Sequence, residues 1–501
     1  MDQLSNLMQG FSLALTPINL VWVVVGCVLG TAVGVLPGLG SAMAVALLLP
    51  VTFSLDPVGA FIMFAGIYYG GLFGDSTTAI LMNTPGNSTA IASTFEGHRM
   101  AKRGRAPQAL ATAAIGAFTG GLLATILVVF FAPVLAELAT VFGPAEYFAL
   151  AIVAFVATAA VVADSAVKGL SALAIGLAIA LVGVDAISGA ARYTFGIPSL
   201  LDGIDIVVIT VGLLALGEVL FIASRIHKDP EATAMKISGR PYLSGKEFRE
   251  ALPAWLRGSA FGLPFGAIPA GGAEIPTFLA FGLERNLDRR RADPQFGTGA
   301  IRGLAAPESA ANATAGSAMG SLLALGLPTS ATAAIMLAAF QQYGMQPGPL
   351  LFVRNAELVW ALLASLFVGM IVLLVINLPF APLWAKLLMI PKPYLYAGIT
   401  VFSALGVYAS SGSIFDVAML TVIGLLGFAL RRFGLPLAPV LIAVILGPLA
   451  ETSLRRALAI SEGDPGALFS SGLTITLYCL LLLGLVWVAF SRLRNRAQAD
   501  I

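Results

Sequence analysis

The stretch Gly34-Val35-Leu36-Pro37-Gly38-Leu39-Gly40 decides the fold, because it interrupts an apolar segment and returns in altered form as Gly266-Ala267-Ile268-Pro269-Ala270-Gly271-Gly272. Each copy is followed by a second polar interruption. In the first half it reads Asn83-Thr84-Pro85-Gly86-Asn87-Ser88-Thr89-Ala90, and in the second Gly326-Leu327-Pro328-Thr329-Ser330-Ala331-Thr332-Ala333. Proline beside glycine, hydroxyl or amide side chains stops a helix. The four interruptions therefore predict helices that break inside apolar sequence at matching places in two halves.

The composition indicates a membrane protein. The chain has 501 residues, of which 58% are apolar and only 11% are charged, with a mean hydropathy of +0.92. Soluble domains carry roughly 25% charged residues, and a helix needs roughly 20 apolar residues to cross the hydrocarbon core. We expect an all-α polytopic membrane protein with about 10–12 transmembrane segments, plus re-entrant or broken helices. The net charge of +2 implies no nucleic-acid partner.

The distribution of charge divides the chain into two halves. Residues 225–256 hold most of the mid-sequence charge, and they separate a first transmembrane repeat (1–224) from a second (257–501). Basic residues favour the cytoplasmic side. They predict a cytoplasmic linker, a cytoplasmic C-terminus and a periplasmic N-terminus. The second half then starts on the opposite side from the first, as inverted repeats require.

Polar residues at the four interruptions are the candidate binding site. Broken helices expose backbone amides at mid-membrane depth, and helix N-termini attract anions. Neither second interruption contains a basic residue, which suits an anionic substrate accompanied by cations. This pattern favours a secondary transporter. The expected substrate-binding residues are Pro37, Gly38, Gly40, Ser41, Asn83, Thr84, Pro85, Gly86, Asn87, Ser88, Thr89, Gly271, Gly272, Asn312, Pro328, Thr329, Ser330 and Thr332.

Acidic residues within apolar sequence need a reason, because a carboxylate is costly inside a bilayer. Asp75, with Ser76 and Thr77, suits a hard cation such as sodium, or it caps a helix that continues to Met82. Glu308 lies one helical turn from Asn312, so it either faces a cavity, as a further candidate sodium ligand, or caps the helix after Pro307. Glu274 is expected to cap a helix start, and Glu218 is a candidate for pairing with a neighbouring helix.

The chain resembles the large membrane subunit of tripartite tricarboxylate transporters, the TctA family. The best-matching stretches are Gly34–Phe53, Gly70–Arg105, Ile268–Glu284, Phe296–Asn312 and Gly326–Phe352. The resemblance implies import of a di- or tricarboxylate such as citrate across the bacterial inner membrane, driven by a sodium or proton gradient. It also implies two protein partners, a periplasmic solute-binding protein and a small membrane subunit. No cofactor is expected beyond Na⁺ as a coupling ion.

Other classes of protein fit less well. An intramembrane aspartyl protease needs the motif Gly-x-Gly-Asp, whereas residues 72–75 read Leu-Phe-Gly-Asp. An intramembrane serine protease needs a histidine base, whereas the two histidines, His98 and His227, lie in basic loops. We therefore expect no enzyme activity. A stand-alone carboxylate carrier and an anion channel, each working without a binding protein, remain alternatives.

Overall fold

The computed structural model describes residues 2–36, 40–52, 55–84, 88–139, 141–162, 165–185, 187–225, 235, 237, 239, 241–268 and 272–499. Helices make up 80% of this part of the chain. The α-helices of the first half are α1 (Asp2–Ala14), α2 (Pro17–Val35), α3 (Ser41–Thr52), α4 (Pro57–Met82), α5 (Ile91–Met100), α6 (Ala106–Ala139), α7 (Pro144–Val162), α8 (Ala166–Ala180), α9 (Ile206–Val211) and α10 (Gly217–Ala223).

The second half continues with α11 (Gly245–Ala267), α12 (Glu274–Asp288), α13 (Ile301–Leu325), α14 (Ala331–Gln342), α15 (Leu351–Arg354), α16 (Ala356–Asn377), α17 (Ala381–Leu387), α18 (Lys392–Ser411), α19 (Ile414–Arg432), α20 (Leu437–Ile460) and α21 (Gly472–Ala499). Short 3₁₀ helices are η1 (Ser88–Ala90), η3 (Pro198–Leu200) and η5 (Pro465–Phe469), and π-helical turns are η2 (Ala101–Arg105) and η4 (Gly212–Leu216). Strands β1 (Gly183–Val184) and β2 (Ala191–Arg192) form a small antiparallel ladder.

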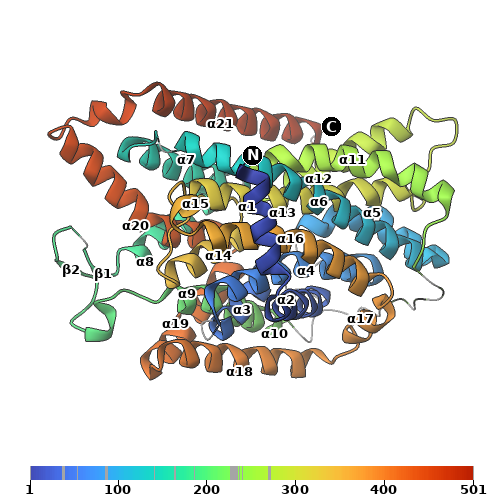
Figure 1. Ribbon diagram of the computed structural model, residues 1–501, viewed down its shortest axis with the longest axis horizontal. Helices are drawn as coiled ribbons and strands as arrows, with labels where there is room; N and C mark the ends of the chain where they lie inside the picture. Colours follow the sequence, from blue (N-terminus) through green and yellow to red (C-terminus); the bar gives the residue numbers. More distant parts are fainter. Residues whose placement is uncertain are drawn as a thin grey trace.

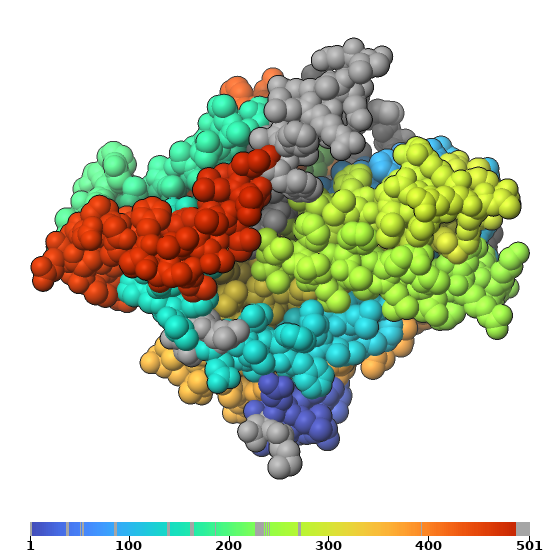
Figure 2. All heavy atoms as spheres, turned by 90° about the horizontal axis from the view of Figure 1, so that it is seen from above, coloured from blue at the N-terminus to red at the C-terminus, as the bar shows by residue number. Residues whose placement is uncertain are grey.

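The prediction of an all-α polytopic membrane protein is confirmed. Seven helical segments of the described chain are long and apolar enough to cross a membrane, and shorter apolar helices such as α3, α7 and α8 accompany them. Most of the long helices run along one common direction in Figure 1, with α18 and α21 at opposite edges. Figure 2 shows α21 on the surface beside α7, against which it packs.

Two helix pairs pack with their backbones in close contact. In the first half α2 runs parallel to α4, and Gly26, Gly30 and Gly34 each lie directly on a backbone carbonyl of α4. In the second half α11 runs parallel to α13, and its glycines lie in the same way on carbonyls of Ala306, Ala310 and Thr314; they are Gly258, Gly262 and Gly266. A side chain at any of these positions would collide with the partner backbone. The glycine-rich apolar segments therefore do what small residues do in membranes, which is to bring helix backbones together.

The order of elements repeats between the halves. Each half has a helix whose glycines recur every fourth residue, then a shorter helix, then a long helix parallel to the first, then a second interruption. These elements are α2, α3, α4 and residues 83–89 in the first half, and α11, α12, α13 and residues 326–330 in the second. This correspondence agrees with the predicted repeat, whereas the inverted relation of the two halves stays a prediction.

Two local expectations differ from the structure. Helix α11 begins at Gly245, inside the segment predicted to be linker, because Ser244 and Glu247 form a reciprocal capping box there. Asp75 lies in the middle of the uninterrupted helix α4 rather than at a helix start, and Glu308 lies within α13. The capping interpretations of Asp75 and Glu308 are therefore wrong, since neither residue begins a helix.

Candidate functional site

A cavity of about 480 Å³ lies where the interruptions of the two halves meet. Five helices begin on its wall: α3 at Ser41, η1 at Ser88, α12 at Glu274, α14 at Ala331 and α20 at Leu437. The remaining wall comes from the interior of long helices, including Tyr68 and Leu72 of α4 and Ala311, Thr314, Ala315 and Ala318 of α13. Ligand pockets in proteins typically have volumes of about 300–1,000 Å³. The cavity therefore has the size of a small-molecule site.

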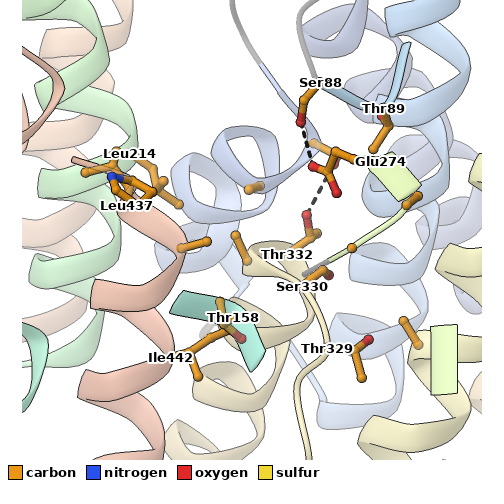
Figure 3. A pocket seen from close by; sticks show the side chains of 18 of the residues that line it. Ser88, Thr89, Thr158, Leu214, Glu274, Thr329, Ser330, Thr332, Leu437 and Ile442 are labelled. Atoms are coloured by element: carbon orange, nitrogen blue, oxygen red, sulfur yellow. Dashed lines mark hydrogen bonds between the residues drawn. The ribbon is translucent and has the colours of Figure 1, made fainter. Parts of the chain in front are cut away.

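The first interruption enters this cavity through η1. Ser88 and Thr89 line the wall, and the Ser88 hydroxyl donates a 2.6 Å hydrogen bond to Oε1 of Glu274. Figure 3 shows Ser88 and Glu274 facing each other at one side of the cavity. Because Ser88 belongs to the first half and Glu274 to the second, this hydrogen bond joins the two halves at the site.

The second interruption lines the opposite part of the same cavity. Ser330 caps α14 by accepting a hydrogen bond from the backbone N–H of Ala333, and the hydroxyls of Thr332 and Ser41 lie 3.2 Å apart. Thr329 is buried, and its hydroxyl oxygen has no hydrogen-bond partner among the described residues. In Figure 3 Thr329, Ser330 and Thr332 lie below Glu274. The structure thus brings the two polar interruptions together, as the sequence analysis expected.

Charged side chains are few on the described wall. Glu274 and Arg431 line it, and Arg431 of α19 forms an ion pair with Glu218 of α10. Glu218 therefore has the inter-helix partner that the sequence suggested. Tyr68 adds a phenol beside Ser330 and Glu274. The wall consequently presents hydroxyls and helix starts, with one guanidinium that already has a carboxylate partner.

The predicted binding residues divide into three groups. The cavity wall contains Ser41, Ser88, Thr89, Gly272, Thr329, Ser330 and Thr332. Five others are described but do not line it. Gly40 and Pro328 are next in sequence to lining residues, and Asn83 is exposed at the end of α4. The Thr84 hydroxyl donates a hydrogen bond to the Met82 carbonyl, and Asn312 is buried beside Ala311. The rest lie outside the described residues, namely Pro37, Gly38, Pro85, Gly86, Asn87 and Gly271.

The candidate sodium ligands lie apart from this cavity, and two of them, Ser76 and Glu308, meet between α4 and α13. The Ser76 hydroxyl donates a 2.6 Å hydrogen bond to Oε2 of Glu308, and both residues are buried. Oε1 of Glu308 and Oδ1 of Asn312 are buried oxygens with no hydrogen-bond partner among the described residues. Asp75 and Thr77 are buried on the same stretch of α4. Oxygen atoms of this kind suit a hard monovalent cation, although the described residues contain no cluster of three acidic, histidine or cysteine ligands.

Sequence reasoning did not place the two charged residues of the described wall, Glu274 and Arg431, in the site. Glu274 was expected to act only at a helix start; it is the first residue of α12, but its carboxylate also faces the cavity. The sequence analysis does not single out Arg431, and no local pattern shows that α19 places it on the wall. Only the folding of the second half against η4 and α10 brings it there.

Comparison with known proteins agrees with this geometry. The model of the "Tripartite tricarboxylate transporter TctA family" matches residues 20–442. An Agrobacterium vitis protein, described as "Uncharacterized 52.8 kDa protein in TAR-I ttuC' 3'region", is 41% identical over 501 residues, covering 100% of this chain and 98% of its own. Another from the same organism, "Uncharacterized protein in TAR-II ttuC' 3'region", is 39% identical over 236 residues, 47% of this chain and 96% of its own. No solved structure matches. The chain belongs to the TctA family, the large membrane subunits of tripartite tricarboxylate transporters.

Proposed function

We propose that this protein imports a di- or tricarboxylate, such as citrate, across the bacterial inner membrane, and that a cation gradient drives the import. The observation that carries the proposal is the convergence of five helix starts and two hydroxyl-rich interruptions on one cavity. By family membership, the substrate reaches the cavity from a periplasmic solute-binding protein, and a small membrane subunit completes the transporter. The N-terminus is proposed to be periplasmic and the C-terminus cytoplasmic.

The electrostatics of the wall favour an anion. A helix start behaves like roughly half a positive elementary charge, and its free N–H groups are ready donors for carboxylate oxygens. Helices α3, α12, α14 and α20 begin on this wall, and η1 leads into α5 beside them. The hydroxyls of Ser41 and Thr329 add donors without adding charge. A dicarboxylate or tricarboxylate can therefore be held mainly by dipoles and hydroxyls, with Arg431 at the wall as an additional donor.

The coupling cation is proposed to be sodium at the buried oxygens between α4 and α13. Glu308 supplies the negative charge and Ser76 supplies a neighbouring oxygen from the first half, with Asp75 and Thr77 adjacent to Ser76 in α4. Sodium binding there would tie α4 to α13, which also form walls of the cavity. In this way cation occupancy would stabilise the arrangement that binds the substrate.

Uptake by reconstituted vesicles tests the proposal. The purified chain, with its small subunit and binding protein, is placed in liposomes with an inward sodium gradient, and radiolabelled citrate and malate uptake is followed. We expect saturable accumulation that collapses when an ionophore removes the gradient. Uptake that stays proportional to substrate concentration would indicate a channel. Full uptake without the binding protein would indicate a stand-alone carrier.

A further inference from the structure

Glu274 places a carboxylate inside a cavity built to bind anions. It is the acidic side chain on the described wall, and it lies at the start of α12, among the helix starts that a substrate would use. An ionised Glu274 therefore repels an incoming carboxylate and competes with it for the same positive helix ends. A substrate anion and a charged Glu274 cannot both be held well in this cavity.

The partners of Glu274 differ from those of three other buried acids, while Glu308, which also has a single hydroxyl neighbour and one unpartnered oxygen, does not line the cavity. Glu96 accepts three backbone N–H bonds, Glu284 pairs with Arg257, and Glu218 pairs with Arg431. Glu274 has the Ser88 hydroxyl on Oε1, while its Oε2 is buried and has no hydrogen-bond partner among the described residues. Within the described chain no basic side chain forms an ion pair with it. One carboxylate oxygen is thus free to carry a proton.

We propose that Glu274 takes up a proton when the anionic substrate enters the cavity and releases it when the substrate leaves. This inference rests on the proposed function and adds a second coupling site to it. With the cavity empty, the start of α12 and the Ser88 hydroxyl stabilise the ionised carboxylate. When substrate carboxylates occupy the helix starts, a proton from water binds Oε2 and removes the repulsion. On release the proton returns to water with the departing anion.

Glu274 is better placed to take up this proton than the ionisable groups around it. Tyr68 of α4 and Arg431 of α19 face the same cavity, and Arg431 is engaged by Glu218 of α10. Three charged residues on the elements packed against α12 have partners of their own. Arg257 of α11 binds Glu284, Glu96 of α5 binds the backbone before α13, and Glu308 of α13 accepts from Ser76.

A proton fits the surroundings of Glu274 better than a metal cation does. Hard cations require several oxygen ligands, whereas the described residues give this carboxylate one hydroxyl neighbour at hydrogen-bond distance, that of Ser88. A proton requires only one acceptor. The Ser88 bond fixes the other oxygen, so the proton-accepting atom is Oε2.

Calorimetric proton counting on the full-length protein in nanodiscs tests the proposal. Citrate, malate and fumarate are titrated in buffers of different ionisation heat between about pH 5.5 and 8.5, and the ionisation of each ligand is subtracted. We expect wild type to take up about one proton per substrate at the high end. Its affinity should fall about tenfold per pH unit above the pKa of Glu274. Glu274→Gln should bind with the affinity that wild type has at low pH, without that proton and without that pH dependence.

The matched control is Glu357→Gln, an exposed acid in the first turn of α16, which should behave as wild type. Substrate binding by wild type without linked proton uptake would overturn the proposal, and this result does not depend on any variant folding. A Glu274→Gln protein that keeps the wild-type pH dependence would overturn it as well. If wild type binds none of the three carboxylates at any pH, the proposed function fails and takes this inference with it.

Discussion

Glu96 and Glu274 each accept hydrogen bonds from the other half of the chain, but they differ in how many of their oxygens have partners. Glu96 of α5 is 1% exposed and accepts backbone N–H bonds of 2.7, 2.7 and 2.8 Å from Gly297, Gly299 and Ala300, immediately before α13. Glu274 of α12 accepts from the Ser88 hydroxyl and keeps one oxygen without a partner. A buried carboxylate whose acceptors are all used holds structure together, whereas one with a spare oxygen on a cavity wall is available for chemistry.

Replacing each of the two carboxylates with alanine should give the largest difference in stability. Glu96→Ala leaves three donors at the start of α13 without an acceptor, so we expect a loss of stability on the order of 3 kcal/mol or more. Glu274→Ala, measured beside it, should cost about a third as much, since it gives up a single hydroxyl bond where Glu96→Ala gives up three backbone bonds. Thermal unfolding in detergent, followed by size-exclusion fluorescence, measures both. Equal destabilisation would show that Glu274 is also a structural brace.

A change on the cavity wall should affect binding and spare stability. Thr329→Val removes a buried hydroxyl that has no protein partner among the described residues. Because a hydrogen bond to a charged group contributes about 1.5–3 kcal/mol, citrate affinity should fall roughly 10- to 100-fold. Isothermal titration measures the affinity, with exposed Thr421→Val as the control. An unchanged dissociation constant for Thr329→Val would remove this hydroxyl from the site.

Asp185 extends the comparison to a third carboxylate, in the loop between α8 and α9. Hydrogen bonds from the Ile187 backbone and the Ser188 hydroxyl, with Arg455 beside it, hold the pKa of Asp185 well below its ordinary value. A depressed pKa in the folded state means that its stabilisation is present above the unfolded pKa, which is about 3.9. The stabilisation is then lost as the pH falls further. The melting temperatures of wild type and Asp185→Asn should therefore differ at pH 7 and converge on acidification.

The smallest effect is expected at Asn83. Its backbone has a φ of 56° at the C-terminal end of α4, its side chain is exposed, and it does not line the cavity. Glycine adopts that conformation easily, so Asn83→Gly should alter stability by only a few tenths of a kcal/mol. Substrate affinity should not change. A large loss of citrate binding in titration would restore Asn83 to the site, as the sequence pattern suggested.

The sequence predicted the parts of this protein that local pattern controls. Long apolar segments and Pro-Gly interruptions predicted an all-helical membrane protein, and the hydroxyls of Ser88 and Thr329 were expected in one site. Arg431 and the role of Glu274 were not foreseen, because both depend on contacts between segments far apart in the chain. Asp75 was open to a capping interpretation because Asp-Ser-Thr-Thr resembles a helix start, yet apolar packing on both sides keeps α4 continuous through it.

The glycine contacts between α2 and α4, and between α11 and α13, restrict how this protein can move. With carbonyl groups seated directly on glycine Cα atoms, neither pair can slide without driving one backbone into the other. Each helix pair therefore behaves as one rigid unit. Any motion that exposes the cavity first to one side of the membrane and then to the other must move each of these helix pairs as a whole. The displacement then falls on contacts without such glycines, such as that of α20 with α7.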